Sequence, residues 1–108
     1  MARQLKLYSL GCRKTEDATG MDDIYIRVDG VTRWSGRITD GQTVDISSID
    51  TIVYGDDQQV NIEIYEQDVE GDDFLGWNPV TNQTPGIPFF LQYSVDGADY
   101  TIKAALLK

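Results

Sequence analysis

Apolar and polar side chains alternate along most of the chain, in short runs separated by turn residues. The run LKLYSLGC (5–12) alternates, and IYIRV (24–28) is rich in β-branched and aromatic side chains. Asp29-Gly30 then gives a strong hairpin signal before VTRWS (31–35). Comparable runs cover 43–49, 51–55, 60–66, 73–80, 89–95 and 99–107. No run keeps a 3.6-residue period, so we predict roughly eight short strands and no sustained helix.

The spacing of these runs indicates the fold class. Strands that recur every roughly 8–12 residues, with turn residues between them, are typical of antiparallel sandwiches and barrels. The chain has 108 residues, of which 41% are apolar. This is enough for one hydrophobic core and too short for two domains. We therefore predict a single all-β domain over residues 1–108.

The net charge of the chain limits the classes of partner that we expect it to bind. Eighteen acidic residues against nine basic ones give a net charge of −9. Nucleic acid is excluded as an expected partner, because binding to phosphates needs a basic surface. Simple electrostatic attraction to anionic lipid is disfavoured for the same reason. Cations and basic partners are favoured.

Several kinds of chemistry lack the residues they need. The chain has no histidine, which removes Ser-His-Asp catalysis and His-dependent zinc sites. Cys12 is the single cysteine, so no internal disulfide can form, and we expect a small half-buried apolar residue there. No nucleophile motif is evident, and we predict that the protein is not an enzyme. A small hydrolase that uses paired carboxylates is the third alternative.

No targeting or membrane segment is expected in this chain. No stretch approaches the length of a membrane span. The N-terminal residues alternate instead of forming the apolar run of a signal peptide. The compartment is therefore not indicated by the sequence.

The acidic residues gather in the segments between strands. Two of these segments, DATGMDDI (17–24) and DVEGDDF (68–74), share one pattern. Each reads Asp-x-x-Gly, an optional residue, Asp-Asp and an apolar residue, and each leads directly into a predicted strand. Hard divalent cations, above all Ca²⁺, take six to eight oxygen ligands from such loops. Zinc would prefer nitrogen or sulfur ligands, which are scarce here.

A plainer interpretation stands beside this one. Charged loops on an acidic protein are often only solvated and keep the protein soluble. The domain would then be a metal-independent structural or interaction sandwich, an accessory domain of a larger system. The match between the two loops favours the metal hypothesis.

The two loops also resemble a known family. The segment DATGMDDIYI (17–26) resembles the first calcium loop of C2 domains, where Asp-x-x-Gly-x-x-Asp-Pro-Tyr-Val leads into a strand. The segment IYEQDVEGDDFLG (64–76) resembles their third loop, Val-x-Asp-x-Asp followed by Asp-Phe-Ile-Gly. The resemblance spans residues 5–107, but its specific part is these two motifs. It implies an eight-stranded antiparallel Greek-key β-sandwich of the C2 type, with both loops at one end.

The resemblance also implies a set of calcium ligands. These are Asp17 and Asp23 from the first loop and Glu66, Asp68 and Asp73 from the third, with Asp72, Glu70 and Asp22 as further candidates. Three departures from the family pattern concern this set. Glu66 replaces the usual Asp, Ile24 replaces the usual Pro, and the segment between Asp68 and Asp73 is one residue short.

The resemblance further bears on partners. Many C2 domains dock on phospholipid membranes when calcium is bound, but the loop tips here offer only Met21 and Val69 among acidic residues. We therefore predict a calcium-binding recognition module for a protein or glycan partner, with phospholipid as the weaker alternative. Trp34 and Trp77 are expected to pack at sheet edges, with a role in surface recognition as the alternative. Phe74 and Leu75 are expected to point into the core.

Overall fold

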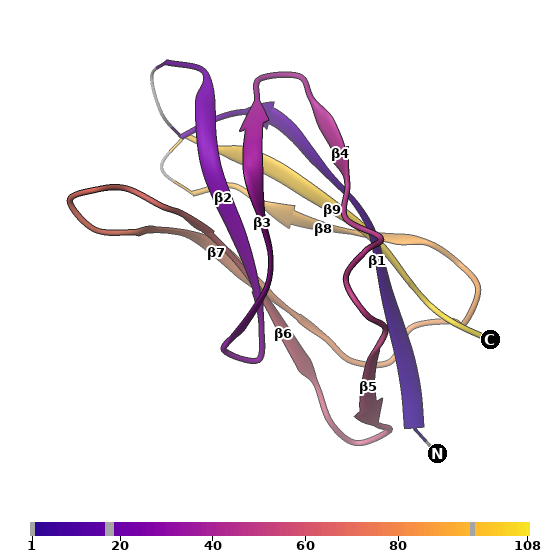
Figure 1. Cartoon of the computed structure of the whole chain (residues 1–108). Helices are drawn as coiled ribbons and strands as arrows, with labels where there is room; N and C mark the ends of the chain where they lie inside the picture. Colours follow the sequence, from indigo (N-terminus) through magenta and orange to yellow (C-terminus); the bar gives the residue numbers. More distant parts are fainter. Residues whose placement is uncertain (1, 17–18, 96) are drawn as a thin grey trace.

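Two antiparallel β-sheets pack face to face in the computed structural model, which describes residues 2–16, 19–95 and 97–108 (Figure 1). The strands are β1 (Ala2–Lys14), β2 (Met21–Val28), β3 (Val31–Thr39), β4 (Thr43–Asp45), β5 (Ile52–Gly55), β6 (Val60–Glu66), β7 (Asp73–Val80), β8 (Phe89–Tyr93) and β9 (Asp99–Leu106). The described residues contain no helix.

The first sheet runs in the order β4-β1-β9-β8, and β5 pairs with the beginning of β1. The long β1 strand therefore serves two short partners, with Leu10 opposite Val44 in β4 and Leu5 opposite Ile52 in β5. Leu10 also lies opposite Ile102 of β9. This register joins the two ends of the chain in one sheet.

The second sheet runs in the order β3-β2-β6-β7 and is built from two hairpins. The hairpins meet where β2 pairs with β6, with Ile26 opposite Ile64 and Tyr25 opposite Tyr65. Because successive side chains of a strand point to opposite faces, the isoleucines point inward and the tyrosines outward. The outer face of this sheet therefore carries aromatic rings.

Inward-facing side chains of both sheets form one hydrophobic core. The largest fully buried side chains are Leu5, Leu7, Leu10, Ile24, Ile26, Ile38, Ile46, Ile62, Ile64, Leu75, Tyr93 and Tyr100. In β6 the buried positions recur every second residue from Val60 to Glu66. Cys12 is buried in the same core, more completely than the half-buried position that the sequence predicts.

The predicted all-β sandwich is confirmed, with nine strands instead of eight. The run 43–49 is shorter as a strand than expected, since β4 ends at Asp45. Ile46 and Ile49 nevertheless remain buried in the core from the connection that follows. The apolar residues in 46–49 are therefore buried although this segment is not part of a strand.

The prediction for Phe74 is wrong, whereas Leu75 is fully buried as expected. Tyr65 lies opposite Phe74 while Ile64 lies opposite Gly76, so Leu75 is an extra residue in β7. Gly76 has a φ of 129°, a conformation that glycine readily adopts in such bulges. The bulge places Phe74 on the outer face against Tyr65, with 5.3 Å between the ring centroids.

The other edge of this sheet has a similar irregularity. Ile26 lies opposite Trp34 and Arg27 lies opposite Thr32, which leaves Arg33 as an extra residue in β3. Trp34 is half-buried and packs against the core. Both edge strands of the second sheet are thus bulged.

None of the residues that the structure describes belongs to a helix long and apolar enough to cross a bilayer.

Candidate metal centre

Glu66 is a carboxylate at the end of an apolar row. It is the last residue of β6, and it follows Val60, Ile62 and Ile64 on the inward face of the strand. Only 5% of its surface is exposed. Its Oε2 atom is buried and has no hydrogen-bond partner in the structure. Buried polar atoms are normally paired, so this oxygen indicates a missing ligand or a bound proton.

Two groups of carboxylates converge on Glu66. Oxygen atoms of Glu16, Asp22 and Glu66 lie within 4.8 Å of one another. Oxygen atoms of Glu66, Asp68 and Asp73 do so as well. Glu66 belongs to both groups and thereby joins the β1–β2 loop (15–20) to the β6–β7 loop (67–72). We call these five residues the acidic cluster.

Asp22 is fixed in place by hydrogen bonds. It is the second residue of β2 and shares the inward face with Ile24, so only 1% of its surface is exposed. Its Oδ2 atom accepts a hydrogen bond from the Glu16 backbone N–H at 2.7 Å and another from the Tyr100 hydroxyl. Burial and the neighbouring Asp22 carboxylate raise the pKa of Tyr100, which keeps that hydroxyl a donor.

The β6–β7 loop is held by an outward-facing tyrosine. The Tyr25 hydroxyl donates a hydrogen bond of 2.6 Å to Asp72 Oδ2, while the Asp68 N–H donates to Asp72 Oδ1 at 3.3 Å. Partial burial and the hydrogen bond to Asp72 raise the pKa of Tyr25 to about 12. The Tyr25 ring in turn stacks on Tyr65 with 5.1 Å between centroids. Asp72 therefore shapes the loop from outside the acidic cluster.

The charges of the acidic cluster shift the pKa of Glu66, one of its two buried members. Burial, and then the carboxylates of Asp22, Glu16, Asp68 and Asp73, raise the pKa of Glu66 from 4.5 to about 7. Near neutral pH this carboxyl is therefore about half protonated. A cation in the acidic cluster would oppose each of the electrostatic causes of the shift.

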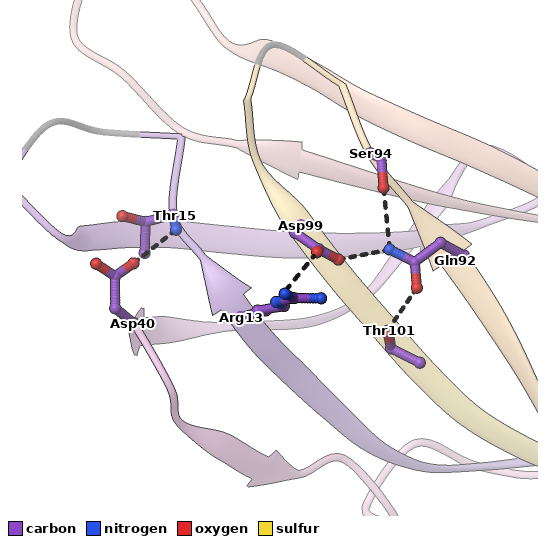
Figure 2. A network of polar contacts seen from close by, with 7 residues as sticks. All are labelled: Arg13, Thr15, Asp40, Gln92, Ser94, Asp99 and Thr101. Atoms are coloured by element: carbon purple, nitrogen blue, oxygen red, sulfur yellow. Dashed lines mark hydrogen bonds and ion pairs between the residues drawn. The ribbon is translucent and has the colours of Figure 1, made fainter.

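Hydrogen bonds beside the loops hold the surrounding strands (Figure 2). The Thr15 N–H donates to Asp40 Oδ1 at 2.7 Å, which ties the beginning of the β1–β2 loop to the turn after β3. The Gln92 side chain bridges β8 and β9, donating to Asp99 at 2.5 Å and accepting from Thr101 at 2.8 Å. Arg13 lies 4.0 Å from Asp99. This end of the sandwich is thus cross-linked around the loops.

Known proteins were compared with the chain. No protein-family model matches it, and no curated protein sequence matches it significantly. Among solved structures, a structure of a C2 domain matches with a TM-score of 0.58 and 17% sequence identity, covering 98% of this chain and 99% of that chain. This chain has the C2 fold.

Two structures of one larger protein also match this chain. Human GIVD cytosolic phospholipase A2 in complex with methyl γ-linolenyl fluorophosphonate inhibitor and terbium chloride matches with a TM-score of 0.55 and 12% identity. The same phospholipase with methyl γ-linolenyl fluorophosphonate matches with a TM-score of 0.54 and 13% identity. Each match covers 99% of this chain but 17% of the phospholipase. At these low sequence identities the matches show a shared fold and say nothing about a shared activity.

The structure brings together part of the predicted ligand set. Glu66, Asp68, Asp73 and Asp22 lie in the acidic cluster. Asp23 points to the other face of β2, where its Oδ1 atom lies 3.1 Å from Arg37 Nε.

Two further members of the set, Asp72 and Glu70, lie outside the acidic cluster. Asp72 faces Tyr25 instead of Glu66. Glu70 is exposed, and its N–H lies 3.5 Å from Asp68 Oδ1. Asp17 lies outside the described residues. Glu16 was not among the predicted ligands, although it directly precedes the first acidic segment, 17–24.

Proposed function

We propose that this C2-fold domain is a calcium-binding module, and that the acidic cluster holds the ion. The observation that carries the proposal is the buried and unpartnered Oε2 atom of Glu66, which lies among four further carboxylates. Carboxylates crowded together without a cation are unfavourable, because like charges repel and the two buried members, Asp22 and Glu66, lack full hydration. An oxygen-binding cation would remove both costs.

The donor set fits calcium better than other common metals. All ligand atoms offered by the acidic cluster are carboxylate oxygens, and Ca²⁺ takes six to eight oxygen ligands in flexible geometry. Magnesium keeps most of its water and uses fewer protein ligands. Zinc prefers sulfur and nitrogen, which this cluster does not offer.

The carboxylates of the acidic cluster would hold the ion in different ways. Asp22, held by Tyr100 and the Glu16 backbone, provides a fixed carboxylate on the inner side of the site. Asp68 of the exposed β6–β7 loop and Asp73 at the beginning of β7 would close the site from outside. A bound calcium ion supplies the positive charge that lets Glu66 stay ionised between the two loops. The ordered loop end would then present a recognition surface to a partner.

Calcium is expected to raise the melting temperature of the domain markedly. An ion at 100 times its dissociation constant stabilises the folded state by about 2.7 kcal/mol. For a domain of this length, this corresponds to a shift of roughly 10–20 °C. Thermal melts in chelator, in millimolar calcium and in millimolar magnesium measure the shift and its selectivity.

Two substitutions of equal charge provide the matched comparison. Asp68→Asn should lose most of the calcium shift, whereas Asp23→Asn should keep it because Asp23 faces Arg37. A calcium shift that is absent in the wild-type protein would instead support a metal-independent interaction sandwich with solvated loops. If both variants keep the full calcium-induced shift in melting temperature, the ion binds outside the acidic cluster.

Tyr25→Phe is expected to weaken calcium binding without unfolding the domain. The variant keeps the ring that stacks on Tyr65 but loses the 2.6 Å hydrogen bond to Asp72. Without this bond the β6–β7 loop is less ordered before calcium binds and must lose more conformational freedom when it does. We therefore expect a calcium affinity about 3–10 times lower. Isothermal titration calorimetry measures the affinity. Tyr54→Phe, which removes a hydroxyl bonded to the Thr81 carbonyl, serves as a control that should not change it.

A further inference from the structure

The outer face of the second sheet carries a row of side chains that the metal centre does not use. Arg27 of β2 lies opposite Glu63 of β6, and Glu63 lies opposite Trp77 of β7. The Trp77 side chain is 51% exposed, an unusual state for the largest apolar residue. Sheet pairing thus places an acid directly beside an open indole ring.

A hollow opens next to this row. It measures about 350 Å³ and is lined by Asp29, Gly30, Gln59, Asn61, Glu63 and Trp77. None of these residues belongs to the acidic cluster. The lining combines two carboxylates, two amides and one indole, and it contains no basic side chain.

The neighbouring groups fix the carboxylates from one side. Asp29 Oδ1 accepts the Asn61 N–H at 2.8 Å, and Glu63 Oε2 accepts the Tyr65 hydroxyl at 3.1 Å. Arg27 is occupied at the rim, since its guanidinium lies over the Tyr65 ring and donates to the Gly30 carbonyl at 2.6 Å. The hollow is therefore a prearranged acidic site with an aromatic wall.

We propose that this hollow binds an arginine side chain of a basic partner protein. The charge is complementary, because two carboxylates face a hollow that has no base in its lining. A guanidinium group stacks well on an indole and forms paired hydrogen bonds with carboxylates. The net charge of −9 would also draw a basic partner toward the domain. This proposal does not depend on calcium binding.

The test uses a tetra-arginine peptide with blocked ends and the full chain in millimolar calcium at low salt. Nuclear magnetic resonance titration of the Trp77 indole N–H should show saturable shifts, with Trp34 as the internal reference. Glu63→Gln, followed by the same indole signal, and Trp77→Ala, followed by the backbone amide signal of Glu63, should each weaken binding about tenfold. Asp45→Asn, an equal charge change on exposed β4 of the other sheet, should change it less than twofold.

Two results would overturn the proposal. An equal loss of affinity in Asp45→Asn and Glu63→Gln would mean nonspecific attraction to an acidic protein. Shifts of the Trp77 indole with a neutral oligosaccharide but not with tetra-arginine would assign the hollow to glycan. Melting curves of each variant establish that it is folded, which is expected because Trp77 and Glu63 lie on the outer face.

Discussion

Glu66→Gln is expected to raise the stability of the calcium-free domain at pH 8 and to abolish its response to calcium. The folded state raises the pKa of Glu66 from 4.5 to about 7, because the carboxyl is buried among other carboxylates. The folded state therefore holds this proton more tightly than the unfolded chain. The stability from that proton is complete below pH 4.5 and is lost as the pH rises through 7.

The size of the effect follows from the shift. Ionising Glu66 in the folded protein costs roughly 3 kcal/mol at pH 8 relative to pH 4. Glutamine has the same shape and no charge, so the variant avoids this cost at every pH. Wild type and variant should thus be similar near pH 5 and should separate by up to roughly 3 kcal/mol at pH 8.

Urea unfolding in chelator at several pH values from 5 to 8 measures this difference. Added calcium should reverse the order at pH 8, since the ion stabilises only the wild-type protein. Asp23→Asn is the control, because it removes a charge from the outer face of β2 next to Arg37. A wild-type domain that becomes more stable in chelator as the pH rises from 5 to 8 would contradict the argument.

Ile64→Ala is expected to cause the largest loss of stability among simple core substitutions near the site. Ile64 is fully buried, lies opposite Ile26 and Gly76, and precedes Glu66 by two residues on the same face of β6. Removing its side chain beyond Cβ leaves a cavity where the sheets meet. Such changes cost about 2–5 kcal/mol, whereas Ile64→Val should cost about 0.5–1.5 kcal/mol.

Urea unfolding of both Ile64 variants gives these values, and repeating it in calcium tests whether core and site are separate. If Ile64→Ala still folds, calcium should stabilise it by as much free energy as it stabilises the wild type. A loss of the calcium effect in the folded Ile64→Ala variant would mean that β6 must be tightly packed for Glu66 to be positioned.

Strand alternation predicted much of this arrangement. The inward series of Ile24 and Ile26 in β2 extends back to Asp22 and not to Asp23, so period two alone favours Asp22 as the residue that faces Glu66. The comparison of loop motifs favoured Asp23 instead, because it relied on spacing between acids. Where the two signals differed, the pleat of the strand decided the geometry.

Other features depended on contacts that local patterns do not contain. Glu16 joins the acidic cluster because its backbone bonds to Asp22, and Asp72 is drawn outward by Tyr25 from a strand 47 positions earlier. Phe74 lies outside because of a bulge at Leu75. A single inserted residue reverses the face of its neighbours, and only the partner strand shows where it occurs.

The bulged edges of the second sheet bear on how the protein behaves at high concentration. An open edge offers unpaired N–H and C=O groups on which strands of other molecules can add, the first step toward amyloid. On β7 the bulge at Leu75 and Pro79, which has no N–H, interrupt that template. On β3 the bulge at Arg33 brings in a charge. The outer strands of the other sheet, β4, β5 and β8, have only three to five residues. Each outer strand thus carries a feature that disfavours the addition of strands from other molecules.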